Sequence, residues 1–286
     1  MQLVFAAGLV ASSAKSLAPF KLYQPGSVAE ALAALATVEN PVLLAGGTDL
    51  VACFNEGLNP LAIVDLARVE ELRSIEADSH LLDIGAGVTH GVGCVHAAVR
   101  SRVPGFARAW ERIANPRIRF RATLGGNLMA RRARYEGAML LTALGASLEF
   151  ASAAGSRSLT VPDLCAGRAP PQSLLTRIRI DTTGLLWYGY ERSMRPLITL
   201  ATSLHRSAGA MRLRCAVATE YLHPVVLELA LPAADLAQVA AVALTTAHEA
   251  FKQLPASFAD PVVTHSYAVA AGTALLSRQL AGAAHG

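Results

Sequence analysis

The chain has 286 residues, of which 53% are hydrophobic and 16% charged, and its formal net charge is +4. The length suits one large domain or two ordinary ones, and the charged fraction lies below the roughly 25% of a typical soluble domain. The small, dispersed charge gives no support for nucleic-acid binding, and no apolar run of 18 residues predicts a membrane span. The surplus of apolar residues favours burial at a subunit interface.

The first predicted elements are short. Residues 1–18 are mildly apolar, but no basic residue precedes the apolar core, so we expect a peripheral extension or a segment translated from an upstream start codon rather than a signal peptide. Ser27 and Glu30 have capping-box spacing, which predicts a helix to about Thr37. Apolar runs predict buried strands at 41–44, 62–66 and 81–84.

The middle of the chain alternates between helices and strands. A helical stretch begins at Thr89, breaks at Pro104 and resumes over 106–113. A further helix is predicted around 138–144. A hairpin pairs 148–151 with 157–161, and a strand follows at 174–180.

The character of the sequence changes near Asp181. Three strands are predicted at 185–190, 197–204 and 211–218, followed by two Ala-rich helices near 233–251 and 262–280. Strands followed by helices predict an α+β fold whose two parts pack directly together.

The four cysteines lie far apart, at 53, 94, 165 and 215, and form no CxxC pair. No histidine lies at ligand spacing from them, so neither zinc nor an iron–sulfur cluster is expected on this chain. Dispersed cysteines are typical of reduced thiols in a cytoplasmic protein. The histidines form no nucleophile–base or metal-spaced group, so the sequence predicts no catalytic residue and no metal ligand.

The most informative feature is a pair of Gly-Gly turns 79 residues apart. The first lies in the run Leu43-Leu44-Ala45-Gly46-Gly47-Thr48-Asp49-Leu50, and the second in Thr123-Leu124-Gly125-Gly126-Asn127. Glycine allows a positive φ and has no Cβ, so neighbouring amides can converge on an anion. Two such turns facing each other would hold a diphosphate from both sides. A single Gly-Gly pair is usually only a tight turn, and Asp49 is expected to cap a short helix.

These motifs also resemble a known family. The segments LLAGGTDL and IANPRIRFRATLGGNL, in this order, look like the flavin-binding medium subunit of molybdenum hydroxylases, which include xanthine dehydrogenase and carbon monoxide dehydrogenase. The likeness runs from Ala18 to about Ala283 and includes GAGVTH at 85–90. It implies a FAD-binding domain of the PCMH type, as in vanillyl-alcohol-oxidase-like flavoproteins, over 19–182. A small α+β domain of the carbon monoxide dehydrogenase flavoprotein type would follow over 183–286.

The resemblance also implies cofactors and partners. FAD would bind to this chain, while a large subunit carries the molybdopterin cofactor and a small subunit carries [2Fe–2S] clusters. Such subunits assemble as a dimer of heterotrimers. The chain would take electrons from the nearer cluster and pass them to an external acceptor: NAD, oxygen, a quinone or a carrier protein.

The resemblance assigns cofactor contacts residue by residue. The amides of Gly46, Gly47 and Thr48 would contact the diphosphate, and Ile113 and Leu175 would line the flavin. Glu136 stands where the family usually has an Asp that contacts sugar or ribityl hydroxyls. The expected cofactor-binding residues are Leu43, Leu44, Ala45, Gly46, Gly47, Thr48, Asp49, Leu50, Ile113, Thr123, Leu124, Gly125, Gly126, Asn127, Glu136 and Leu175.

The sequence departs from the family pattern at two places. Arg131, Arg132 and Arg134 replace small or acidic residues after the second turn, where they would either raise the flavin potential or pair with an acidic partner surface. A lysine common in relatives has no counterpart near 188–195, where Arg192 or Arg195 would substitute for it.

A further arginine group precedes the second turn. Arg117, Arg119 and Arg121 alternate, which predicts one face of an extended segment, solvated or at an interface. A direct contact with FAD is the less favoured alternative for them.

Two other functions stay open at this point. Weakened FAD binding would leave a flavin-poor scaffold that joins the large and small subunits. Alternatively, the chain would be a stand-alone flavin oxidase acting on a small alcohol or phenol without molybdenum.

Overall fold

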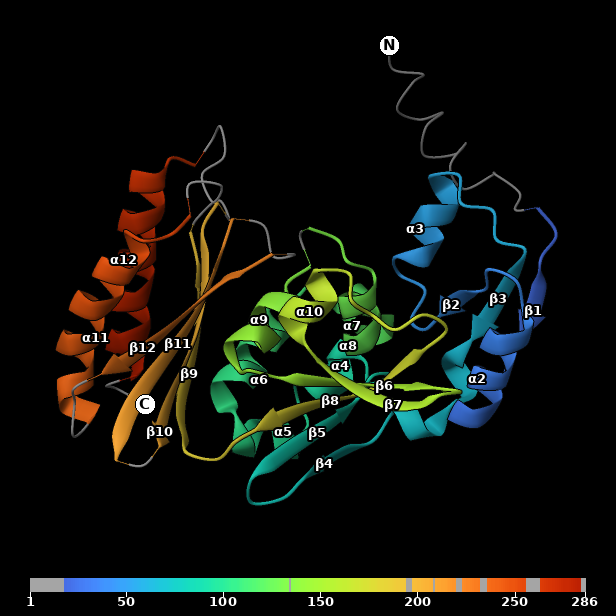
Figure 1. The fold of residues 1–286 in the computed structure, drawn as a ribbon, viewed down its shortest axis with the longest axis horizontal. Coiled ribbons are helices and arrows are strands. Elements are labelled where there is room, and N and C mark those ends of the chain that lie inside the picture. The colour runs from blue at the N-terminus through green and yellow to red at the C-terminus, as the bar shows by residue number, and fades with distance from the viewer. Residues whose placement is uncertain are drawn as a thin grey trace, which may run out of the picture.

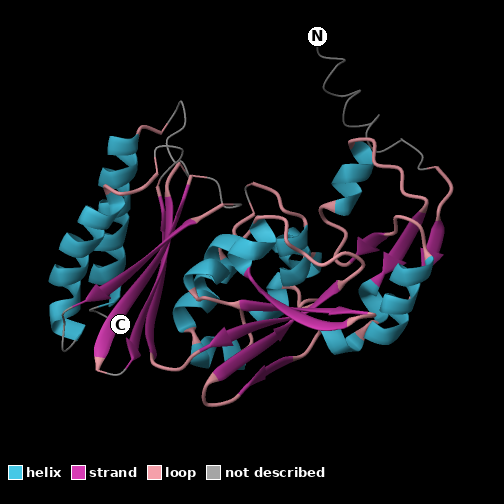
Figure 2. Ribbon diagram, viewed as in Figure 1, coloured by secondary structure: helices cyan, strands magenta, loops and turns pink. Residues whose placement is uncertain are grey.

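The computed structural model describes residues 18–133, 135–193, 197–207, 209–219, 223–231, 236–255 and 263–283. The expectations for residues 1–17, for Arg134 and for Arg195 therefore lie outside the described residues. In the described part, three sheets follow one another along the chain, and helices separate or cover them (Figures 1 and 2).

The first sheet is small and parallel, with strand order β1-β3-β2. Its elements, with the helices between them, are β1 (Lys21–Tyr23), α2 (Val28–Thr37), β2 (Val42–Leu44), α3 (Leu50–Asn55) and β3 (Ala62–Asp65). The expected cap of α2 is confirmed, because Ser27 Oγ accepts from the Glu30 amide at 3.1 Å. The Glu30 carboxylate accepts from the amide of Gly26 rather than from that of Ser27. Two short 3₁₀ turns, η1 (Leu66–Arg68) and η2 (Glu70–Leu72), lead on to the second sheet.

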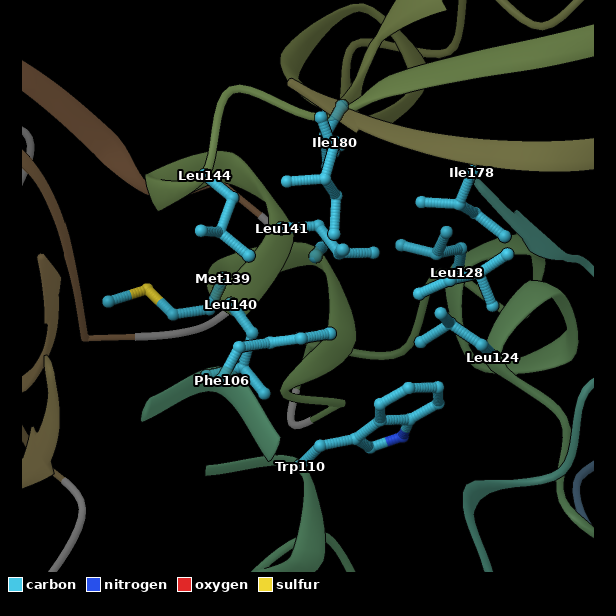
Figure 3. Packing of buried hydrophobic residues seen from close by; sticks show 14 of the residues in the cluster. Phe106, Trp110, Leu124, Leu128, Met139, Leu140, Leu141, Leu144, Ile178 and Ile180 are labelled. Carbon is cyan, nitrogen blue, oxygen red and sulfur yellow. The ribbon is translucent and has the colours of Figure 1, made fainter. Parts of the chain in front are cut away.

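The second sheet has strand order β4-β5-β8-β6-β7 and is antiparallel throughout. Its strands are β4 (Ile75–Ala77), β5 (Leu81–Gly85), β6 (Ser147–Ser152), β7 (Gly155–Thr160) and β8 (Leu174–Asp181). The helices inserted along it are α4 (His90–Gly93), α5 (Ala97–Arg102), α6 (Pro104–Glu111), α7 (Pro116–Arg121), α8 (Leu124–Met129), α9 (Gly137–Ala143) and α10 (Val161–Cys165). Figure 3 shows the core between these helices and the sheet, where Phe106 and Trp110 lie near Leu124, Leu140 and Ile178.

The third sheet is antiparallel, in the order β12-β11-β10-β9. Its strands are β9 (Leu185–Arg192), β10 (Thr199–Ser207), β11 (Ala210–Ala218) and β12 (Val225–Leu231), and helices α11 (Leu236–Phe251) and α12 (His265–Ala283) follow. These two helices cover one face, while α6 and α9 lie against the other (Figure 1).

Burial of the third sheet on both faces is visible in β11. Cys215 and Val217 belong to the core beneath α11 and α12, whereas Ala216 and Ala218 belong to the core of the preceding helices. Side chains alternate between faces along a strand, so this strand contributes to two cores. Part of the apolar surplus is thereby buried within the chain.

The predicted α+β class is confirmed, and several details differ. Residues 116–121 form helix α7 rather than an extended segment, because Asn115 Oδ1 accepts from the Ile118 amide at 3.1 Å and Pro116 occupies the first turn. Strands β1, β4 and β12 were not predicted, because β1 and β4 are only three residues long and β12 is half-exposed. Among the described helices, none is long and apolar enough to cross a membrane.

Candidate functional site

A cavity of about 1080 Å³ lies where three segments meet: the turn after β2, the turn after β5 and the segment from α7 to α8. Every expected cofactor-binding residue lines this cavity except Leu44 and Leu124. Leu124 is instead fully buried in the core of the second sheet. Tertiary structure therefore brings the two Gly-Gly turns, Ile113, Glu136 and Leu175 to one cavity.

The first turn lines this cavity and contains backbone donors that the described chain does not use. Gly47 has φ +77°, a value that glycine adopts without strain. Among the described residues, no backbone or side-chain acceptor is recorded for the amides of Gly46, Gly47 and Thr48. Consecutive free amides beside a positive-φ glycine form an anion-binding concavity.

The first turn contacts the end of α7, just before the second turn. Arg121 Nε donates to the Gly46 carbonyl oxygen at 3.1 Å. A Cβ placed on Gly46 would lie 2.0 Å from the Arg121 carbonyl oxygen, so only glycine fits there. The missing side chain of Gly46 therefore allows the close contact with Arg121, in addition to any close approach of a ligand.

The second turn is built differently, and the expectation of matching designs is wrong in this respect. Gly125 and Gly126 belong to α8 and have no positive φ. Their amides already have acceptors, Gly125 with the Ala86 carbonyl at 2.9 Å and Gly126 with Thr123 Oγ1 at 3.0 Å. A Cβ on Gly125 would lie 2.7 Å from the Ala86 carbonyl oxygen. The second turn therefore supplies a closely packed wall rather than free amides.

Glu136 forms the part of the wall nearest the third sheet. The residue is 7% exposed, and Oε1 accepts hydrogen bonds from Arg192 Nη1 at 3.0 Å and from the Tyr190 hydroxyl. Both partners lie on β9. Arg192, one of the two residues expected to substitute for the family lysine, thus holds a carboxylate of the cavity.

Arg131 and Arg132 do not line the cavity, and both bond within the chain. Arg131 Nη2 donates to the Cys165 carbonyl at 3.0 Å. Arg132 pairs with Asp49 at 2.9 Å and with Glu56 at 3.3 Å. Asp49 makes no side-chain capping bond to α3, contrary to expectation, because its backbone is helical rather than extended, and its Oδ1 bonds to Arg132 and Tyr135 instead.

His90 is a cavity-lining residue that the sequence analysis missed. It is 1% exposed, and its Nδ1 accepts from Trp110 Nε1 at 2.6 Å, so the neutral ring carries its proton on Nε2. Burial, together with the charge of Arg119, lowers its pKa from 6.5 to about 4. Among the described atoms Nε2 has no hydrogen-bond partner.

The GAGVTH segment that contains His90 offered a signal. Its residues pair with the chain just before α8: the His90 amide donates to the Ala122 carbonyl at 2.9 Å, and Thr89 bridges to Thr123. The small residues at 85–87 indicate a close backbone approach, but not the partner segment. Phe120, 80% exposed, also lines the cavity and lies on the unpredicted helix α7.

Comparison with known proteins identifies the family. Residues 18–182 match the model of the FAD binding domain in molybdopterin dehydrogenase. The match covers more than half of the chain, which therefore belongs to this family. The matched residues include both Gly-Gly turns and every residue of the expected cofactor set.

Curated relatives agree with this assignment over part of their length. The chain is 34% identical over 144 residues to the nicotine 6-hydroxylase medium subunit of Paenarthrobacter nicotinovorans, covering 50% of this chain and 51% of that protein. It is 30% identical over 192 residues to the carbon monoxide dehydrogenase medium chain of Afipia carboxidovorans, covering 64% and 66%. The chain spans about half the length of the first curated relatives it matches.

Solved structures show the same fold over nearly the whole chain. A chain of quinoline 2-oxidoreductase from Pseudomonas putida 86 superposes with a TM-score of 0.77 at 24% identity, covering 95% of this chain and 99% of that one. A chain of the Cu,Mo-CO dehydrogenase gives a TM-score of 0.75 at 24% identity, covering 93% and 98%.

Proposed function

We propose that this chain is the FAD-binding electron-transfer subunit of a molybdenum-dependent hydroxylase or dehydrogenase. The observation that carries the proposal is the turn at Gly46–Thr48: its amides are free, and its residues line a cavity of about 1080 Å³ inside a family FAD-binding domain. A diphosphate is the ligand that such an array of donors favours. The medium subunits among the relatives support the same role.

The residues present fit a flavin nucleotide. The amides of Gly46, Gly47 and Thr48 would hold the diphosphate, and the apolar side chains of Ile113 and Leu175 would lie against the ring system. Glu136 would accept from hydroxyl groups through Oε2, since Oε1 is held by β9. FAD, when bound, accepts and releases electrons one or two at a time. No acid–base group is needed on the chain for that role.

Partner subunits follow from this proposal. A large subunit with the molybdopterin cofactor would oxidise the organic substrate, and a small subunit with [2Fe–2S] clusters would deliver electrons to this chain. We place the boundary of the FAD-binding domain near Thr182, where the family match ends, with the third sheet and its helices as the second domain. Assembly as a dimer of heterotrimers belongs to the same proposal.

The scaffold alternative is less well supported by the cavity. That alternative rested on the arginines after the second turn and on the missing family lysine. Neither Arg131 nor Arg132 lines the cavity, and Arg192 holds the cavity carboxylate of Glu136. Arg134 lies outside the described residues. Against the stand-alone oxidase alternative, three titratable side chains that line the cavity are already engaged: His90 Nδ1 accepts from Trp110, Asp49 pairs with Arg132, and Glu136 pairs with Arg192.

Purification of the chain with its co-expressed partner subunits tests the proposal. The expected result is oxidised-flavin absorption and, after acid release, FAD equimolar with the chain by chromatography. A colourless yet stably assembled complex would support the scaffold instead. Oxidation of a small alcohol or phenol by this chain alone, without molybdenum, would support the oxidase.

A further inference from the structure

The free-amide turn is attached to a helix with little packing of its own. Helix α3 begins directly after the turn, and none of its residues is buried. Figure 1 shows α3 beyond the ends of β2 and β3, at the edge of the molecule. Because burial contributes little, the position of the turn depends on polar contacts from other segments.

Arg132 provides the most extensive of these contacts. Its Nε donates to Asp49 Oδ1 at 2.9 Å, and its Nη2 reaches Glu56 Oε2 at 3.3 Å and Cys53 Sγ at 3.1 Å. Asp49 and Glu56 are the N-cap and C-cap residues of α3. One guanidinium therefore contacts residues at both ends of α3.

The loop that carries Arg132 is itself anchored. Arg131 adopts φ 48°, which is unusual for a side chain with a Cβ, and donates to the Cys165 carbonyl at the end of α10. The Tyr135 amide donates to the Arg132 carbonyl at 3.1 Å, and its hydroxyl donates to Asp49 Oδ1 at 2.8 Å. Arg132 and Tyr135 thus hold the same carboxylate oxygen from a fixed loop.

The charge of Arg132 has a second effect. Asp49 directly follows Thr48, whose amide is one of the free donors, so an unpaired Asp49 carboxylate would repel a diphosphate there. The Arg132 guanidinium opposes that repulsion at 2.9 Å. The same pairing with Asp49 and Glu56 raises the pKa of Arg132, so its charge is permanent.

We propose that Arg132 is a positioning residue for the cofactor diphosphate: it fixes α3, and with it the amides of Gly46, Gly47 and Thr48, and offsets the charge of Asp49. The proposal rests on the proposed function, since it presupposes a diphosphate at this turn. It also gives the arginine-rich loop a role different from flavin tuning and from partner binding.

The test compares Arg132→Gln, Arg132→Lys and the unchanged full-length chain, each freed of flavin and titrated with FAD and with riboflavin. Riboflavin lacks the diphosphate, so it reports on the ring pocket alone. We expect Arg132→Gln to raise the Kd for FAD roughly tenfold or more, as the loss of a charge-assisted contact predicts, and to leave the Kd for riboflavin within about twofold. Arg132→Lys should recover part of the loss, because it keeps the charge but not the fork.

The matched control is Arg157→Gln, which removes the same charge from an exposed position on β7. It should leave both Kd values unchanged. In Arg132→Gln/Asp49→Asn, FAD binding should be no weaker than in Arg132→Gln, because the repelling carboxylate is also gone. If Arg132→Gln does not fold, Tyr135→Phe removes the neighbouring contact to Asp49 and should give a smaller loss in the same direction.

Unchanged FAD affinity in Arg132→Gln would overturn the proposal. Equal losses for FAD and riboflavin would also overturn it, because they would indicate a general structural role. A separate outcome bears on the proposed function: if the unchanged chain binds riboflavin but not FAD, or neither, then both the FAD assignment and the role of Arg132 are wrong.

Discussion

Arg192 reaches from strand β9 across to Glu136 on the cavity wall, and Arg192 Nη1 lies 3.0 Å from Glu136 Oε1. The two residues are 56 positions apart. Because Arg192 lies on β9, the third sheet orients the Glu136 carboxylate, which belongs to the cavity wall. Glu136 is 7% exposed, and an anion so placed requires a partner.

This relationship gives the first prediction. Glu136→Ala should lower the free energy of unfolding of the flavin-free chain by about 1–3 kcal/mol, because Tyr190 loses its buried acceptor and Arg192 its counter-ion. It should also weaken FAD binding. Denaturant unfolding and FAD titration measure the two effects, with Glu136→Gln as the control that keeps an acceptor. Unaltered unfolding in Glu136→Ala would contradict the prediction.

The glycines of the two turns give the second prediction. Gly46→Ala and Gly125→Ala should each destabilise the flavin-free chain by about 1–3 kcal/mol, because each new Cβ would meet backbone within 3 Å. Loss of FAD should follow from the displaced turns. Gly26→Ala is the control, since its Cβ would meet only the Glu30 carboxylate, at 3.6 Å. Variants that keep full stability but lose FAD would show that ligand approach alone requires these glycines.

The third prediction concerns pH and His90. The pKa of His90 is lowered from 6.5 to about 4, so between these pH values His90 is protonated in the unfolded chain and neutral in the folded chain. Stability should be complete above pH 6.5 and should fall as the pH drops from 6.5 towards 4, by about 3 kcal/mol from this residue.

Denaturant unfolding at a series of pH values measures this dependence. A His90→Gln variant should show a shallower decline over the same window, because glutamine does not titrate. His205→Gln serves as the comparison, since burial also lowers the pKa of His205 but its ring lies away from the cavity. Parallel curves for His90→Gln and the unchanged chain would assign the pH dependence to other groups.

The fourth prediction concerns the cap of α8. Thr123 Oγ1 accepts from the Gly126 amide at 3.0 Å, so Thr123→Val should lower the free energy of unfolding by about 1 kcal/mol. Thr123→Ser should retain most of the stability, because it keeps the hydroxyl acceptor. Thermal unfolding of both variants measures the difference, and a loss in the serine variant as large as in the valine variant would show that packing of the methyl group matters as much as the cap.

Local sequence signals predicted a large part of the fold. The apolar runs before the first turn, the Ser27 cap and the Pro104 break all act within a few residues, so they can be read without knowing the fold. Helix α7 was missed because the alternation of its arginines resembles an extended segment, although Asn115 and Pro116 carry a helix-start signal. Strand β12 was missed because its pattern alone does not show that β11 lies beside it.

The candidate site was predicted only in part, for the same reason. The two Gly-Gly turns look alike in the sequence, but only the first has free amides. In the second turn the Gly125 amide donates to the Ala86 carbonyl, which belongs to a distant segment. The hydrogen bond between His90 and Trp110 joins residues 20 positions apart, and no local sequence pattern predicts it.

The sequence by itself determined the α+β class, the family and the positions of the two glycine turns, because these depend on local patterning and on glycine's missing side chain. Tertiary structure alone decided which amides remain free for an anion, which arginines hold α3, and which carboxylate Arg192 orients. The arginine contacts, such as Arg132 with Asp49, join segments 50 or more residues apart, and the amide of Gly125 finds its acceptor in the distant Ala86; only the packed chain brings such segments together.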